Sequence, residues 1–299
     1  MDRVTRPSSA RIAAIGGVVA ALGGVWLASG PARDQVPAGT SAEPVRTLAS
    51  VNTFSPPAAR EAEPDRRQSA KVPSAAALRD AWSYARAREG EVSLAVVDSE
   101  GRLRGRGEDR LYSAASTVKA MLLAAELERL ERDGLPLDPA TDSLLDAMIT
   151  YSDNAAADAI YARVGDEGMF AVAERAGMEG FTEAGHWGNA QISAADLARF
   201  YSRLDELMAG PQRAYALGLL GSIVPEQSWG IPAAAGERWA VRFKGGWLPD
   251  HALVHQAAEL RERAGDRELS LAVLTDAQPS HDYGVETVRG VAARLLAER

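Results

Sequence analysis

The segment Ser116-Thr117-Val118-Lys119 brings together a hydroxyl and an amine that could act jointly. In a helix, residues i and i+3 lie on one face, so the Lys119 amine is predicted beside the Ser116 hydroxyl. The surrounding turn is apolar, and burial lowers the pKa of a lysine until it can accept a serine proton. A helix N-terminus also stabilises developing negative charge. Ser116 is therefore a candidate nucleophile with Lys119 as its base, although the pattern alone is more often an ordinary capped helix.

Two further polar clusters follow along the chain. Ser152-Asp153-Asn154 stands between two expected helices, and Lys244-Gly245-Gly246-Trp247 stands at the end of an expected strand. Taken alone, the first cluster fits a turn or a helix cap, and the second fits a bulge or turn at a strand end. What favours a joint site is the combination of three such clusters on a helix, an inter-helix loop and a strand.

The elements that would position these clusters follow from hydrophobic periodicity. Two strands, a helical block, three strands and a final helix predict an α/β fold. An antiparallel sheet from both chain ends, with flanking helices, would pack against a helical lobe, and the active site would lie between them. The expected helices are 74–89, 116–133, 142–151, 154–164, 167–176, 194–208 and 285–297, and the expected strands are 92–97, a second from Arg102, 239–244, 253–260 and 269–274.

The composition excludes several classes of function. The formal net charge is −8 and the pI about 5.2, which argues against a nucleic-acid partner, since such a partner requires a basic surface. The chain contains no cysteine, so thiol nucleophiles, disulfides and cysteine-ligated metal sites are excluded. It also has no H-E-x-x-H sequence for a helix-borne zinc site. We expect neither a metal nor an organic cofactor.

The N-terminus indicates export. Three arginines precede the uncharged stretch 12–28, a pattern typical of a signal peptide or an uncleaved anchor within residues 1–30. Residues 31–73 hold seven of the fifteen prolines and predict a disordered tether. A single domain would occupy 74–299. We expect the protein outside the cytoplasm, secreted or anchored to the cytoplasmic membrane by its N-terminal segment, and monomeric.

Together the three clusters resemble the S-x-x-K, S-D-N and K-T-G signature set of class A β-lactamases and penicillin-binding proteins. The resemblance extends over roughly residues 75–299; two motifs match fully and the third at two of three places. It implies that Ser116 is the acylated nucleophile and Lys119 its proton acceptor. Ser152 would relay a proton to the leaving nitrogen.

The same resemblance implies the substrate-binding residues. Asn154 would hydrogen-bond the substrate amide, and Lys244 would attract the substrate carboxylate. Gly246 would lie in the strand that borders the substrate. The oxyanion hole would consist of the backbone N–H groups of Ser116 and Trp247.

The chain also departs from that family. Class A enzymes activate the deacylating water with a glutamate from a W-E-P-like segment; here the corresponding interval holds only Glu179, Glu183 and His186, and none of them matches. Asp158 stands where those enzymes carry an asparagine that braces the glutamate, and Gly245 replaces a hydroxyl-bearing residue. Only 36 residues separate Ser116 from Ser152, which predicts a trimmed helical lobe.

The resulting hypothesis is a serine hydrolase acylated by a β-lactam or a D-alanyl-peptide-like substrate, with slow hydrolysis of the acyl-enzyme. A D,D-peptidase-type enzyme and a catalytically lapsed protein that binds cell-wall peptide are the alternatives. A Ser-His-Asp hydrolase is disfavoured because the chain has no G-x-S-x-G elbow around any serine.

Overall fold

The computed structural model describes residues 73–208, 210–248 and 253–297. The signal or anchor segment and all but the last residue of the tether, as predicted from sequence, lie outside the described residues. Within the described part of the chain, no helix is long and apolar enough to cross a membrane.

A five-stranded sheet unites the two ends of the domain, as the sequence predicted. Its order is β2-β1-β7-β6-β5, and all neighbouring strands are antiparallel. Strand β5 is therefore an edge strand, and the first strand of the domain pairs with the last. The bounds are β1 (Glu91–Asp98), β2 (Leu103–Arg106), β5 (Trp239–Leu248), β6 (Leu253–Glu262) and β7 (Glu268–Asp276).

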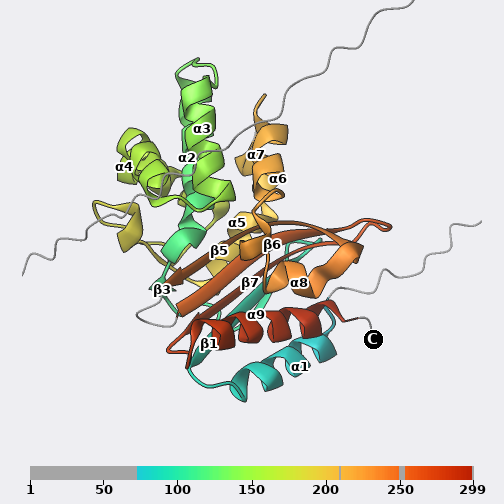
Figure 1. Cartoon of the computed structure of the whole chain (residues 1–299). Coiled ribbons are helices and arrows are strands. Elements are labelled where there is room, and N and C mark those ends of the chain that lie inside the picture. Colours follow the sequence, from blue (N-terminus) through green and yellow to red (C-terminus); the bar gives the residue numbers. More distant parts are fainter. Residues whose placement is uncertain (1–72, 209, 249–252, 298–299) are drawn as a thin grey trace, which may run out of the picture. The chain divides into compact units, whose positions relative to one another are not determined.

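Two long helices cover one face of this sheet and lie side by side, α1 (Ala75–Arg86) and α9 (His281–Leu296) (Figure 1). Helix α1 begins where the Ser74 hydroxyl accepts a hydrogen bond from the Ala77 N–H at 3.1 Å, as expected of a serine N-cap. The short helix α8 (Ile231–Ala235) packs on α9.

The remaining helices form a lobe on the other side of the sheet (Figure 1). At its centre, the 3₁₀ turn η1 (Ala115–Val118) leads into α2 (Lys119–Arg132). Every residue of α2 from Lys119 to Leu127 is buried, which confirms the prediction that the first half of this helix is enclosed. Around it are α3 (Pro139–Thr150), α4 (Asn154–Ala176), α5 (Ala194–Ser202), α6 (Leu204–Leu207), α7 (Arg213–Leu220) and a two-stranded sheet of β3 (Tyr112–Ser113) and β4 (Gln191–Ile192).

The structure corrects several predicted boundaries. The two helices expected at 154–164 and 167–176 form one element broken at Gly165, whose φ of 60° and ψ of −174° are not helical. The helix expected at 194–208 is interrupted at Arg203. Helix α9 begins at His281, because the Ser280 hydroxyl accepts from the Tyr283 N–H and caps it there.

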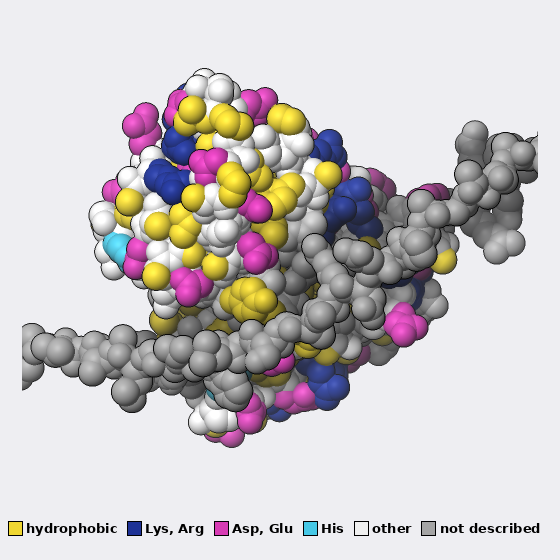
Figure 2. Space-filling model, turned by 45° about the horizontal axis from the view of Figure 1, so that its top comes forward, with side chains coloured by type: hydrophobic (Ala, Val, Ile, Leu, Met, Phe, Trp, Pro, Cys, Tyr) yellow, Lys and Arg dark blue, Asp and Glu magenta, His cyan; other side chains and the backbone are white. Residues whose placement is uncertain are grey.

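The surface of the lobe is of mixed charge. Figure 2 shows acidic and basic side chains interspersed over the face turned to the viewer, with no field of one sign. Such interspersed charges are typical of a solvated surface rather than of a nucleic-acid interface.

Candidate active site

Ser116 lies in the η1 turn directly before α2 and is half-buried. The preceding residue, Ala115, has a φ of 46°, which is in the left-handed region that L-residues avoid. Such strain costs on the order of 1–3 kcal/mol and persists only where the surroundings enforce it. The turn therefore presents the Ser116 hydroxyl at the head of a buried helix instead of using it as a simple cap.

Lys119 is completely buried one turn further on. Its Nζ donates to the Ser152 carbonyl oxygen at 2.6 Å and to Asn154 Oδ1 at 2.7 Å. Burial lowers the pKa of Lys119 to about 8, although the charges of Asp153 and Asp158 oppose the shift. Nζ also lies 3.4 Å from Ser152 Oγ. Its contacts within the described residues are thus with Ser152 and Asn154, and it forms no hydrogen bond to Ser116.

Lys244, on β5, is the second buried lysine. Its Nζ donates to Ser152 Oγ at 3.0 Å and to the Gly245 carbonyl oxygen at 3.1 Å. Burial, and then the like charge of Lys119, lower its pKa to about 7. Ser152 itself adopts a φ of 62°, so its backbone is held in a rare conformation that sets the hydroxyl between the two lysines. A hydroxyl that accepts from one amine can still donate its own proton.

Gly246 brings the edge strand against the Ser116 turn. A Cβ atom at this position would lie 2.7 Å from the Ser116 nitrogen and 2.9 Å from the Thr117 nitrogen. Only glycine permits this approach, because backbone atoms cannot move aside as a side chain can. The contact places the N–H of Ser116 beside the end of β5, where Trp247 follows.

His255, which the sequence did not single out as a site residue, braces this arrangement from β6. It lies opposite Gly246 in the strand register. Its Nδ1 accepts from the Thr275 N–H at 3.1 Å, so its Nε2 carries the proton and donates to the Ser113 carbonyl oxygen at 3.1 Å. Burial lowers its pKa to about 4, so the ring is neutral at pH 7 and holds the segment that leads to Ser116. Isolated on an apolar strand, it gave no sequence signal.

The loop before β4 closes over Lys119. The Trp187 ring centroid lies 5.0 Å from Lys119 Nζ. Asp158 Oδ1 accepts from Trp187 Nε1 at 2.7 Å and contacts His186 Nε2 at 3.1 Å. Because His186 Nδ1 accepts from the Gly188 N–H, both ring nitrogens are engaged. Asp158 thus anchors the loop through its aromatic residues, and His186 has no free nitrogen to act as a base.

The two glutamates of this loop have different surroundings. Glu179 is exposed and pairs with Arg199 at 3.3 Å. Glu183 is buried, and neither of its carboxylate oxygens has a hydrogen-bond partner within the described ranges. Burial, and then the charge of Asp166, raise its pKa to about 7.

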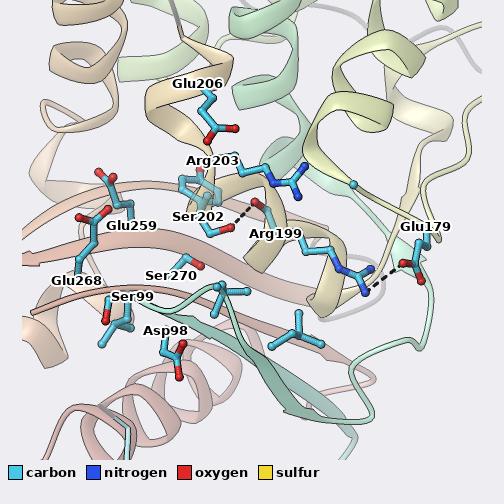
Figure 3. A pocket seen from close by; sticks show the side chains of 16 residues that line it. Asp98, Ser99, Glu179, Arg199, Ser202, Arg203, Glu206, Glu259, Glu268 and Ser270 are labelled. Atoms are coloured by element: carbon cyan, nitrogen blue, oxygen red, sulfur yellow. Dashed lines mark hydrogen bonds and ion pairs between the residues drawn. The ribbon is translucent and has the colours of Figure 1, made fainter. Parts of the chain in front are cut away.

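A cavity of about 520 Å³ lies elsewhere, between β1, β7 and α5, and none of the candidate catalytic residues lines it. Most of the charged side chains that line it form ion pairs. Arg199 reaches across to Glu179 (Figure 3), and Glu259 pairs with Arg242 and Arg261 outside the view. We assign this cavity no catalytic role. No group of histidine and carboxylate side chains in the described segments could hold a metal ion.

Comparison with known families gives a match to the β-lactamase enzyme family over residues 139–298. This segment includes Ser152, Asn154 and Lys244, whereas Ser116 and Lys119 precede it.

Relatives and solved structures point the same way. A Mycobacterium tuberculosis protein named "Putative lipoprotein LppW" is 32% identical over 132 residues, which are 42% of each chain; the chain thus spans less than half the length of the curated relatives it matches. A β-lactamase from Sphaerobacter thermophilus has a TM-score of 0.64 at 21% identity, over 74% of this chain and 95% of that one. A class A β-lactamase from Mycobacterium abscessus has a TM-score of 0.63 at 18% identity, over 74% and 98%.

Proposed function

The chain belongs to the β-lactamase enzyme family, and we propose that Ser116 is acylated by a β-lactam or a D-alanyl-peptide-like substrate and that the acyl-enzyme is hydrolysed slowly. The observation that carries this proposal is the pair of buried lysines that share the Ser152 hydroxyl beside the Ser116 turn. Two buried lysines whose pKa values are lowered and whose Nζ atoms approach one hydroxyl indicate a functional site.

The geometry supports acylation of Ser116 with Lys119 and Ser152 transferring the protons. Neutral Lys119 takes the Ser116 proton as Oγ bonds to the substrate carbonyl carbon. The carbonyl oxygen becomes an oxyanion, and the N–H groups of Ser116 and Trp247 receive it. When the C–N bond breaks, Ser152 gives its proton to the leaving nitrogen, and the proton held by Lys119 restores the Ser152 hydroxyl. The products are an ester on Ser116 and a neutral amine.

The loop over Lys119 supports slow hydrolysis. Trp187 occupies the space above the amine, and Asp158 is engaged with two aromatic side chains. Glu183 is buried in this loop, but its carboxylate forms no hydrogen bond to Ser116, Lys119 or any other described residue. A carboxylate without such a link to the site is poorly placed to direct a water molecule toward the ester.

Intact-mass spectrometry after incubation with benzylpenicillin tests the proposal. We expect an adduct with the mass of the whole antibiotic, because ring opening loses no atoms, and we expect it to persist for minutes or longer. Ser116→Ala should abolish the adduct, and Glu183→Gln should leave its lifetime unchanged. Rapid turnover without an adduct would contradict slow hydrolysis. A chain that binds the antibiotic without any covalent mass would instead be a binding protein.

We further propose that the protein acts outside the cytoplasm, attached to the membrane. The name of the mycobacterial relative supports a membrane-attached protein. The apolar stretch 12–28 is the proposed attachment. Fractionation of cells that express the full chain, with and without residues 1–30, would test this.

A further inference from the structure

Three aromatic rings meet beside the edge strand that borders Ser116. Trp229 precedes α8, Trp247 lies near the end of β5, and His281 opens α9. Their centroids are 6.2, 6.0 and 6.1 Å apart in the three pairings, all edge-to-face. This separation is favourable for aromatic pairs. All three side chains are half-buried, so each ring keeps part of its surface open. We call these three residues the aromatic triangle.

The triangle stands where the third motif departs from its family. A Cβ atom on Gly245 would lie 3.3 Å from two ring carbons of Trp229. In a strand, residues i and i+2 point to the same side, so Trp247 projects to the side on which Gly245 has no side chain. The ring of Trp229 therefore occupies the space into which a hydroxyl-bearing side chain at position 245 would otherwise extend.

The position of Trp229 is fixed by its neighbours. Gly230 has a φ of 63°, and the next N–H, that of Ile231, donates to Gln256 Oε1 at 2.6 Å. Gln256 is the register partner of Gly245. The segment that carries Trp229 is thus fastened to the strand pair that carries Gly245. A wall fixed in this way binds with little ordering cost.

From this geometry we infer that the leaving-group side of the site accepts uncharged aromatic groups in preference to groups that carry a carboxylate. This inference rests on the acylation of Ser116 in the proposed function and narrows its leaving group: carboxylate-bearing substrates such as penicillins would react, but more slowly than uncharged aryl esters. Two N–H groups of Lys244 are engaged by Ser152 Oγ and the Gly245 carbonyl, and Gly245 supplies no hydroxyl. A carboxylate here would lose water against indole faces and gain few hydrogen bonds. An aromatic ring would stack on those same faces without that cost.

The corresponding reaction is acyl transfer from an aryl ester. Ser116 Oγ bonds to the ester carbonyl carbon, the bond to the phenolic oxygen breaks, and the serine proton passes through Lys119 and Ser152 to that oxygen. A water molecule then hydrolyses the Ser116 ester and releases the acid. The phenol is the group that would lie against the aromatic triangle.

Two matched esters test the inference with the full chain. Phenylacetylglycine phenyl ester and its 3-carboxyphenyl counterpart share the acyl group and differ in one carboxylate. We expect kcat/KM, corrected for the alkaline hydrolysis rate of each ester, to favour the phenyl ester by about tenfold, as is typical of one well-packed apolar contact. Trp229→Ala should lower only the phenyl-ester value and bring the ratio close to one.

The controls separate failure of this inference from failure of the proposed function. Trp82→Ala removes a half-buried tryptophan from α1 and should leave the ratio unchanged. Trp229→Ala/Gly245→Ser adds a hydroxyl in the space that is freed and should reverse the preference. An equal or higher value for the carboxyphenyl ester in the wild type would overturn the inference while leaving acylation intact. If neither ester nor benzylpenicillin labels Ser116, the proposed function itself fails.

Discussion

The two buried lysines are the residues on which the proposed chemistry depends. Each is completely removed from solvent, and their Nζ atoms approach the same Ser152 hydroxyl, at 3.4 Å for Lys119 and 3.0 Å for Lys244. Two ammonium groups so close together repel each other, and burial penalises the charged form of both. The site therefore holds a labile proton near neutral pH, as acyl transfer through a serine and a lysine requires.

The pH dependence of acylation follows from this pair. In the proposed reaction neutral Lys119 is the base, so the acylation rate should rise about tenfold per pH unit below its pKa and level off above about pH 8. Lys244, with a pKa of about 7, is mostly neutral at pH 8, so Lys244→Met should leave the midpoint near pH 8. Lys244→Arg places a permanent positive charge beside Lys119 and should move the midpoint to lower pH. Stopped-flow measurement of acylation with a fluorescent penicillin gives the profile, and a higher midpoint in the Arg variant would contradict the assignment.

The sequence predicts residues whose spacing is local and misses those whose partners are distant. Ser116 and Lys119 are three apart, so helical geometry alone brings them to one turn. His255 acts through its hydrogen bond to Ser113, which is 142 residues away in the chain. Trp229 acts through its contact with Gly245, which is 16 residues away. Glu183 was named as a loop candidate, but its burial and raised pKa depend on how the loop packs against Asp166. No pattern along the chain encodes such contacts.

At the scale of elements, the contact between β5 and the η1 turn decides whether the site forms. We expect Gly246→Ala to lower the acylation rate about 100-fold, because the new Cβ would force the backbone of Ser116 or Thr117 to shift. The same overpacking should cost about 1–3 kcal/mol of stability. Single-turnover acylation and thermal unfolding measure the two effects.

Gly218→Ala provides the matched control for that substitution. Gly218 lies in α7, and a Cβ atom there would meet nothing within 4 Å. Alanine in a helix is favoured over glycine, so this variant should acylate normally and unfold at the same or a higher temperature. Normal acylation by the Gly246→Ala variant would show that the close approach of β5 is not required.

Element types follow from the sequence more reliably than element ends. Periodic apolar residues predict α1, α2, α9 and every strand of the large sheet. The breaks depend on single residues in their tertiary setting: Gly165 adopts a non-helical conformation inside α4, and Arg203 separates α5 from α6. Helix α8 has only five residues, which is too short for a periodic pattern to stand out.

For the molecule as a whole, the order of strands and helices predicts the fold class but not which strands pair with one another. The sequence indicates strands at both ends of the domain, yet only the structure shows that β1 lies between β2 and β7 and that β5 is left as the edge beside Ser116. The same closure brings α1 against α9. Arg88, just after α1, donates to the Thr287 hydroxyl at 2.9 Å and to the Tyr283 carbonyl at 3.1 Å.

The packing of α1 against α9 predicts how far the chain can be shortened from its N-terminus. A chain that begins at Pro73 keeps Ser74 and the whole of α1, so it should unfold at the temperature of the full chain and acylate at the same rate. A chain that begins at Glu89 loses the buried Leu78, Ala81 and Ala85 and exposes the side of α9 that they cover. The free energy of unfolding should fall by on the order of 5 kcal/mol because that apolar area is no longer buried. For a domain of this size, this lowers Tm by about 10–20 °C. Calorimetry of the two shortened chains measures the difference, and equal Tm values would mean that α1 is not part of the cooperative domain.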